Sequence, residues 1–504
     1  MKNYIIIVLF SICFQIPLNA QIVNYGQPST SLIGSNGIID QDGNHVFLSR
    51  GNTNNILSFF GPDNVEIWSK KFDFSSTDGI ILELSDGDYL CALSSSFGQI
   101  LKFNSAGDII WHKKIHFQIK SAFECVDNRI VIAGQRIDSF LMMIDLEGNT
   151  VWSRKIEKES PYSVVFPVAI PSIDNEILFT SKPRKTGDSI SYQNFSKFNI
   201  DGDLVWQKSL IKPFNHYANS MVQAESGAIY TVGSAIMYGE PNFSDVLISK
   251  YSSTGEFERT IQCGYQWGDD GFDIIEDING DILIVGFTKP VEVCGGNLLV
   301  MKFNPDLDVI FTKIYGTPSG SGAFYFHLHQ KDEMIYAYGS GSLWTSISEG
   351  GGSDVHLLKT DSEFEFLCNQ YDQDWELEDV AYLPSDLSVD IVTHVGANNP
   401  VESTVEETTL NYDWHCGVSL SSTDENKDGV FKLFPNPTSG NFRISGSTPY
   451  KIIVSDISGK TVYESDGMMT SPTAEIDLSQ QNKGIYFVNI LGEDQNEVIK
   501  IILN

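Results

Sequence analysis

Short apolar runs separated by polar turns recur along most of the chain and predict an all-β protein. One phrase returns with small changes: two or three apolar residues, a polar turn that often contains glycine, then an aromatic and a basic residue. It reads ILKFNSAGDIIWHKKI at 100–115 and FSKFNIDGDLVWQKSL at 195–210. No long stretch has the 3.6-residue period of a helix.

The phrase occurs seven times at intervals of 41 to 57 residues, which indicates a repeat architecture. Its aromatic position is occupied in turn by Trp68, Trp111, Trp152, Trp206, Arg259, Phe311 and Cys368. An earlier hairpin precedes the phrase in each repeat, as in FDIIEDINGDILIVGFT at 272–288, where an N-G turn joins two β-rich runs. Four strands in about fifty residues are typical of one blade of a β-propeller.

An eighth unit follows from Asp379 to about Trp414 and lacks an outermost strand. The segment IVNYG at 22–26 is similar to TKIYG at 312–316, the end of a blade, so we expect it to complete that unit and close the ring. We therefore predict an eight-bladed propeller over residues 21–416, with seven blades as the alternative. We expect the tryptophans to pack between blades and the D-G pairs to form turns.

The loops that join second to third strands are long in several repeats, and they share one face with the blade-to-blade connections. Loops on a rigid scaffold commonly carry binding function, so we expect any site on this face. Its candidate binding residues are Trp344, Trp267, Tyr238 and Phe243, aromatic side chains suited to sugar rings or a protein partner. The same geometry brings Cys263 and Cys294 close together and predicts a disulfide between them.

The first twenty residues carry one positive charge, a short apolar stretch and a final Ala20, which is the layout of a secretory signal peptide. The formal net charge of the chain is −32, whereas residues 432–504 contain 6 basic and 8 acidic residues. The acidity therefore lies in the larger part and argues against nucleic acid as a partner.

Local catalytic signatures are missing from the sequence. There is no G-x-S-x-G, no H-E-x-x-H, no phosphate-binding glycine loop and no C-x-x-C pair. His327 and His329 share one side of a strand, but no third metal ligand can be assigned. We expect no metal, no cofactor and no motif-encoded catalytic residue, and whether the chain is an enzyme stays open.

Residues 417–431 are polar and form a linker, after which the composition changes. Six or seven short strands from 432 to 504 predict a small β-sandwich. This segment resembles the type A C-terminal sorting domain of the type IX secretion system of Bacteroidota. The resemblance is carried by Pro435, Asn436, Pro437, Gly440, Asp456, Gly459, Lys460, Gly484, Tyr486 and Lys500.

This resemblance implies export through the periplasm to the outer-membrane surface or beyond by the type IX secretion machinery. It also implies removal of the segment by a surface sortase-like peptidase, with lipopolysaccharide as an attachment point. Two classes of function stay open for the propeller. One is a non-enzymatic module that binds glycan or protein, and the other is an extracellular hydrolase or lyase with acidic residues in the central funnel.

Overall fold

The protein is described from a computed structural model that has no helix among its described residues and forms two compact units, Met1–Ser419 and Leu420–Asn504. The described residues are 21–26, 33–50, 54–62, 64–72, 76, 78–158, 162–185, 191–212, 215–236, 244–264, 268–289, 296–315, 324–341, 354–364, the strands between 370 and 416, and most of 432–503. The two units are treated separately below.

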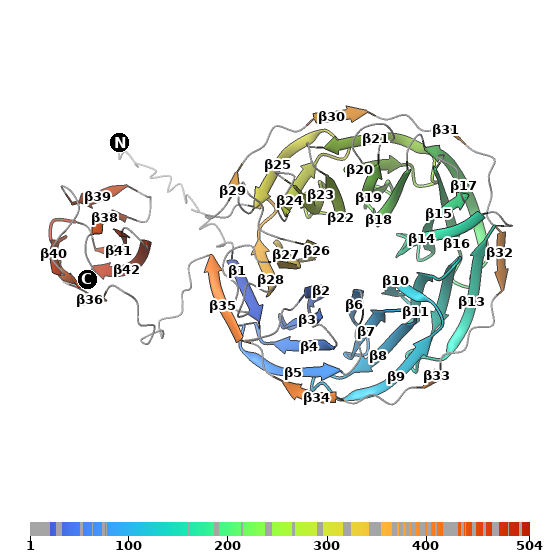
Figure 1. Ribbon diagram of the computed structural model, residues 1–504, viewed down its shortest axis with the longest axis horizontal. Helices are drawn as coiled ribbons and strands as arrows, with labels where there is room; N and C mark the ends of the chain where they lie inside the picture. Colours follow the sequence, from blue (N-terminus) through green and yellow to red (C-terminus); the bar gives the residue numbers. More distant parts are fainter. Residues whose placement is uncertain are drawn as a thin grey trace, which may run out of the picture. The chain divides into compact units, whose positions relative to one another are not determined.

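The first unit is a ring of seven β-sheets, which confirms the predicted propeller (Figure 1). Blade 1 consists of β2 (Ile33–Ile39), β3 (His45–Arg50), β4 (Asn55–Phe60) and β5 (Glu66–Phe72). Blade 2 consists of β6 (Asp78–Glu83), β7 (Tyr89–Ser94), β8 (Gly98–Phe103) and β9 (Ile109–Ile115). Blade 3 consists of β10 (Gln118–Glu124), β11 (Ile130–Gln135), β12 (Ser139–Ile144) and β13 (Thr150–Glu157). Blade 4 consists of β14 (Tyr162–Pro171), β15 (Ile177–Lys185), β16 (Ser191–Phe198) and β17 (Leu204–Lys212). Blade 5 consists of β18 (Asn215–Gln223), β19 (Ile229–Ile236), β20 (Ser244–Tyr251) and β21 (Phe257–Gly264). Blade 6 consists of β22 (Asp269–Glu276), β23 (Ile282–Thr288), β24 (Asn297–Phe303) and β25 (Val309–Tyr315), and blade 7 begins with β26 (Phe324–Lys331), β27 (Met334–Gly341) and β28 (Asp354–Thr360).

The fourth strand of blade 7 comes from the other end of the ring. Strand β1 (Gln21–Gly26) pairs antiparallel with β28, with Ile22 opposite Leu358 and Tyr25 opposite Val355. The N-terminal segment therefore closes the propeller, as the sequence predicts, but it completes the seventh blade.

Seven further strands between residues 370 and 416 run around the outside of the ring, and we call them the belt (Figure 1). Each belt strand pairs antiparallel with the outermost strand of one blade, from blade 6 back through blades 5, 4, 3, 2 and 1 to β1 in blade 7. The belt strands are β29 (Gln370–Tyr371), β30 (Glu376–Asp379), β31 (Leu383–Pro384), β32 (Asp390–Thr393), β33 (Asn399–Pro400), β34 (Val405–Thr408) and β35 (Asn411–Cys416). Every blade thus gains a fifth strand on its outer edge.

The favoured count of eight blades is therefore wrong, and the alternative of seven is right. The segment expected to form the eighth blade forms the belt. The seventh copy of the repeat phrase also departs from the others, because the chain leaves blade 7 after β28 and next pairs with blade 6. Short β-forming runs look alike in a sequence whether they pair with neighbours in the chain or with distant strands.

The hydrophobic core of the ring is divided among the seven junctions between blades. At the junction of blades 5 and 6, for example, Val232 and Val246 pack with Ile284 and Met301. The junction of blades 7 and 1 joins Tyr338 to Phe47, and the Tyr338 hydroxyl donates to the carbonyl of Ile38 at 3.0 Å. Each blade therefore buries its faces only against its two neighbours.

The repeated tryptophans lie between blades, as predicted. The indole N–H of Trp68 donates to the carbonyl of Ser105 in the next blade at 2.9 Å, and a Cβ on Gly107 would lie 2.9 Å from the ring. Gly107 also has a positive φ of 78°, so glycine is required there for both reasons. The same bond joins Trp111 to Leu146 and Trp152 to Ile200, at 2.9 and 3.0 Å.

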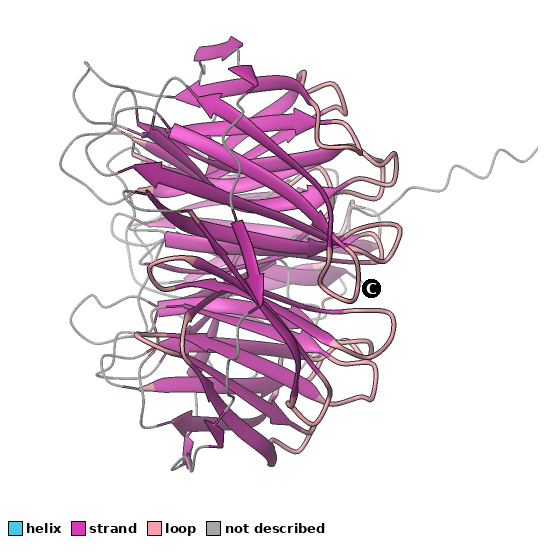
Figure 2. Ribbon diagram, turned by 90° about the vertical axis from the view of Figure 1, so that its right-hand side faces the viewer, coloured by secondary structure: helices cyan, strands magenta, loops and turns pink. Residues whose placement is uncertain are grey.

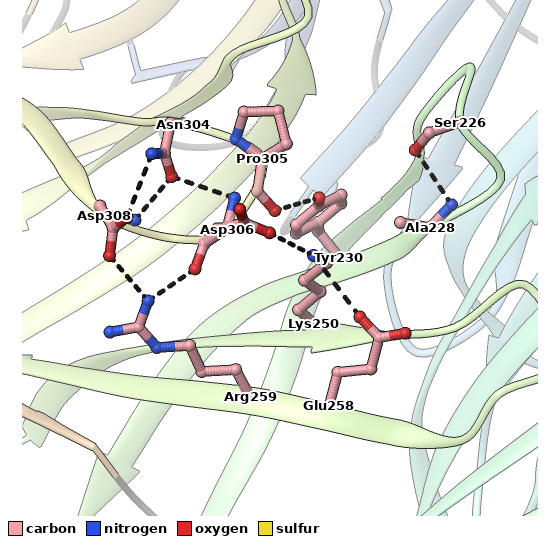
Figure 3. Close-up of polar contacts among 10 residues, drawn as sticks. All are labelled: Ser226, Ala228, Tyr230, Lys250, Glu258, Arg259, Asn304, Pro305, Asp306 and Asp308. Atoms are coloured by element: carbon pink, nitrogen blue, oxygen red, sulfur yellow. Dashed lines mark hydrogen bonds and ion pairs between the residues drawn. The ribbon is translucent and has the colours of Figure 1, made fainter.

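Arginine replaces tryptophan at this position in blade 5 (Figure 3). Arg259 donates to the carbonyl of Asp306 at 2.6 Å and to the carboxylate of Asp308 at 2.9 Å, both in the next blade. Tyr230 and Lys250 reach the same turn. The Tyr230 hydroxyl donates to the carbonyl of Pro305 at 2.6 Å, and the Lys250 ammonium lies 3.0 Å from the carboxylate of Asp306. The repeat therefore preserves an inter-blade contact while the residue that makes it changes.

The tight turns gather on one face of the ring, which we call the turn face (Figure 2). There the ammonium of Lys302, only 2% exposed, lies 3.0 Å from the carboxylate of Asp277 and 3.3 Å from those of Asp281 and Glu363. Glu363 belongs to blade 7 and the others to blade 6, so this ion cluster joins two blades.

We expect Lys302→Met to destabilise the propeller by about 3–5 kcal/mol, because it leaves the fully buried Asp277 charge without its cation. Urea unfolding followed by tryptophan fluorescence measures the loss. Lys208→Met removes an exposed inter-blade ion pair with Glu256 and is the matched control, expected to cost less than about 1 kcal/mol. Equal losses for the two variants would contradict the buried role of Lys302.

The second unit contains two small sheets packed on one core. One sheet holds β36 (Lys432–Phe434), β37 (Asn441–Ser445) and β40 (Thr473–Asp477). The other holds β38 (Tyr450–Asp456), β39 (Thr461–Glu464), β41 (Gly484–Gly492) and β42 (Asn496–Leu503). Strands alternate buried and exposed side chains, with Phe442 and Ile444 from one sheet against Val454 and Val488 from the other.

Candidate binding site in the central channel

The innermost strands of six blades are interrupted in their pairing with the second strand, and in four of them the extra residues line a central cavity. The pairing of β10 skips Lys120, that of β14 skips Phe166 and Pro167, that of β18 skips Asn219 and that of β22 skips Phe272. β2 and β26 carry similar irregularities. A β-bulge re-aims the extra side chain, and here the extra residues line the cavity beside the innermost strands.

Glycines on the second strands accommodate these bulges. A Cβ on Gly233 would lie 1.9 Å from the carbonyl oxygen of Tyr217, and one on Gly286 would lie 2.2 Å from that of Asp270. Gly134 has the same relation to Gln118, at 2.1 Å. A glycine repeated at this place was a sequence signal for the bulges, and the sequence analysis missed it.

Polar side chains after the bulges connect adjacent blades around the channel. Ser220 donates to the carboxylate of Asp273 at 2.6 Å, and the backbone N–H of Leu328 donates to its other oxygen at 2.9 Å. His327 Nδ1 lies 3.8 Å from the same carboxylate. Burial alone would raise the pKa of Asp273, but these partners stabilise its charge and hold the pKa below its ordinary value.

The cavity has a volume of about 490 Å³ and is lined by residues of blades 3 to 7. Its lining residues are Lys120, Phe166, Pro167, Val168, Tyr217, Ala218, Asn219, Asp270, Phe272, Phe287, Lys289 and His327. Phe287 and Lys289 stand where β23 ends and the second-to-third-strand loop begins, so the cavity lies towards the face opposite the turn face. That is the face on which the sequence analysis expects a site.

An aromatic pair forms one wall of the cavity. The rings of Phe166 and Tyr217 stack at a centroid distance of 5.0 Å and an angle of 19°. Phe166 adopts a positive φ of 52°, a strained conformation for a non-glycine residue of a kind that concentrates at functional sites. Behind it, the buried Lys182 ammonium lies 5.9 Å from the ring centroid. Burial, and then the charge of Arg184, lower the pKa of Lys182 to about 8.

The charged groups of the wall are mainly cationic. Lys120 comes from blade 3 and Lys289 from blade 6, while Asp270 is the one carboxylate among the lining residues. Burial raises the pKa of Asp270, whereas the hydroxyls of Ser234 and Ser244 and the charge of Lys289 act in the opposite direction. The cavity therefore combines a flat aromatic surface with lysines on two sides.

The four aromatic residues proposed from the sequence, Trp344, Trp267, Tyr238 and Phe243, lie outside the described residues and stay predictions. Cys263 is a free, buried thiol on β21, so the structure does not contain the predicted disulfide with Cys294, which itself lies outside the described residues. Within the described part of the chain, no group of three or more His, Cys, Asp and Glu side chains could hold a metal ion.

Several residues of the sorting resemblance occupy structural positions in the second unit. Gly440 has a φ of 141°, and a Cβ there would lie 2.9 Å from Ser479, so glycine is required. Tyr486 is buried in the core, and Lys500 pairs with Phe487 across β41 and β42. Asp456 ends β38, Lys460 is exposed, and Gly484 begins β41. Pro435, Asn436, Pro437 and Gly459 lie outside the described residues.

The fold and this second unit define a class of protein: a propeller passenger followed by a secretion signal. Residues 432–504 match the family described as the secretion system C-terminal sorting domain, and this part of the chain is a sorting domain of the type IX secretion system. The protein is therefore exported to the cell surface or outside the cell and interacts with the type IX secretion machinery. No described helix is long and apolar enough to cross a membrane.

Solved structures similar to the chain include a protein of unknown function from Bacteroides caccae, which is 13% identical in sequence. The match covers 57% of this chain and 94% of that one, with a TM-score of 0.37. Another is the polysaccharide lyase Uly1, which is 7% identical; the match covers 65% of this chain and 90% of that one, with a TM-score of 0.44. Drosophila Plexin A in complex with Semaphorin 1b has 8% identity, 67% and 86% coverage and a TM-score of 0.37. No curated protein matches the chain. These likenesses carry no activity over to the protein.

Proposed function

We propose that the propeller is a non-enzymatic binding module that holds a sugar ligand in its central channel. The observation that carries this proposal is the stacked pair of Phe166 and Tyr217 in the wall of a cavity of about 490 Å³. Ligand pockets commonly have volumes of roughly 300–1,000 Å³. An aromatic surface of this kind can stack on the apolar face of a sugar ring.

Export supports the same function. A secreted or surface-bound module meets polysaccharides outside the cell, where a rigid propeller can present a preformed site. The inter-blade hydrogen bonds of Asp273 hold the innermost strands beside the cavity in place, so the ligand need not order them on binding. Surface attachment after removal of the sorting domain would make the module a capture or adhesion protein.

We expect Tyr217→Ala and Phe166→Ala each to weaken oligosaccharide binding by at least tenfold, measured by calorimetry on the full-length chain. Each truncation removes one of the two stacked rings that would contact the sugar. Phe97→Ala is the matched control, because this half-buried aromatic lies under Lys114 and Arg136 and outside the cavity. Circular dichroism establishes that all variants are folded.

Two results would contradict the channel site. One is oligosaccharide binding that survives both channel substitutions but disappears in Trp344→Ala or Trp267→Ala, which would place the site on the long loops. The other is the absence of binding to any oligosaccharide in a panel of neutral and acidic chains.

A second candidate function is a polysaccharide lyase or hydrolase, which the pairing of His327 with Asp273 favours. A carboxylate beside an imidazole can orient it as a general base within the channel. Chromatography of an oligosaccharide after long incubation distinguishes the two functions. A binding module returns the chain intact, whereas an enzyme yields shorter products that His327→Gln abolishes.

A further inference from the structure

Lys120, which is exposed, and Lys289, which is half-buried, differ from three lysines at the tight turns of the ring in having no carboxylate partner. Lys102 lies 3.1 Å from the carboxylate of Asp88 and also contacts Asp86, and Lys197 is paired with Asp174 and Glu176. Lys302 is surrounded by three carboxylates. Lys120 and Lys289, by contrast, form no ion pair with any carboxylate of the described residues.

This difference is notable in a chain with 65 acidic and 33 basic residues. Each of those three lysines has at least two carboxylates within 4 Å, whereas the two channel lysines have none among the described residues. Lys120 stands on a bulge of β10 and Lys289 just beyond β23, and both residues line the one cavity although they come from blades 3 and 6. Asp270 is close enough for Lys289 to influence its titration, yet the two are not ion-paired.

We propose that the sugar held in the channel is acidic and that Lys120 and Lys289 bind its carboxylate groups. This inference rests on the proposed sugar-binding function. The ring of a uronic acid residue stacks on Phe166 and Tyr217, and carboxylates along the oligosaccharide supply the partners that the protein does not. The acidic remainder of the molecule repels a polyanion, so attraction is confined to the channel.

The direct test compares oligogalacturonate and alginate oligosaccharides with their methyl esters, which keep the sugar rings and remove the charge. Calorimetry on the full-length chain should show the acid binding at least tenfold more tightly than the ester. Raising the salt concentration from 0.1 to 0.5 M should remove most of that preference, because the lysines at the channel wall are partly screened.

Variants assign the preference to the two lysines. We expect Lys120→Gln and Lys289→Gln each to weaken binding of the acid by about tenfold and to leave binding of the ester within twofold. Lys208→Gln, at the outer edge of blade 4, is the control and should change neither. Equal affinity for acid and ester would overturn the inference but leave the proposed sugar site standing.

The remaining outcomes also decide between the proposals. A sulfated galactan, which is anionic but carries no carboxylate, would overturn carboxylate recognition in favour of general anion binding if it bound as tightly as the uronates. If the unmodified chain binds no sugar at all, the proposed function itself is refuted.

Discussion

A chain that lacks the belt, residues 370–416, will associate into multimers and melt about 5–10 °C below the full-length protein. The deletion removes the fifth strand from each of the seven blades at once. The outermost strands then expose unpaired backbone N–H and C=O groups, which can pair with other chains. β1 loses β35 and keeps only β28 as a partner, so the closure of the ring weakens.

The size of this effect follows from the number of backbone pairs lost. A net backbone hydrogen bond contributes about 1 kcal/mol, partly offset by the entropy of ordering the belt. We expect a net loss of roughly 3–5 kcal/mol in the free energy of unfolding. Each kcal/mol lowers the melting temperature by about 2–4 °C in a domain of some 200 residues, and by less in a larger one. Exposed edges add irreversible association on heating, which lowers the observed midpoint further.

Light scattering coupled to size-exclusion chromatography measures the association, and calorimetry measures the midpoint. A chain that ends at Ser419 is the control, because it lacks the second unit but keeps the belt. A synthetic peptide of residues 370–416 added during refolding should restore the monomer. A belt-less chain that stays monomeric with an unchanged midpoint would show that the belt does not protect the blades.

The propeller could be predicted from the sequence because its determinants are local. Turns such as Asn279-Gly280 and the phrase around Trp111 fix hairpins within a few residues, and each hairpin pairs with its neighbour in the chain. The belt could not be predicted, because β31 and β33 contain two residues each and pair with strands about 170 and 285 residues away. A two-residue strand has no period, so only the ring itself reveals its partner.

The central funnel was kept as the alternative place for a site, but the residues that line it were missed for a related reason. Lys120 and Phe166 would be ordinary strand residues in a regular pairing, and only the bulge places them in the wall of the cavity. A bulge changes register by one residue and reverses the side to which a side chain points. The repeated glycines at 134, 233 and 286 carried this information, but their meaning depends on carbonyl groups of the adjacent strand.

Removal of residues 432–504 should leave a folded propeller in the periplasm and lower its amount outside the cell by at least tenfold. These residues are the sorting domain that directs type IX export, while the belt and the ring are complete before them. Immunoblots of periplasmic, surface and culture fractions from the native host measure the distribution. Tyr217→Ala in the full-length chain is the control, since it changes the channel and leaves the sorting domain intact.

A single substitution in the sorting domain tests whether export requires its folded core. Val488 is fully buried between the two small sheets, so Val488→Asp places an unpaired carboxylate among Ile444, Val454 and Tyr486. Burial of a charge without a partner is strongly unfavourable, and we expect the variant to unfold this unit and be retained like the truncated chain. Gln480→Ala, at an exposed position of the same unit and outside the residues that carry the sorting resemblance, should leave its core folded. Normal surface levels of the truncated chain would overturn the role of the sorting domain, whereas normal levels of Val488→Asp alone would show that the machinery reads a short linear signal. The comparison of the two variants therefore separates recognition of a fold from recognition of a sequence.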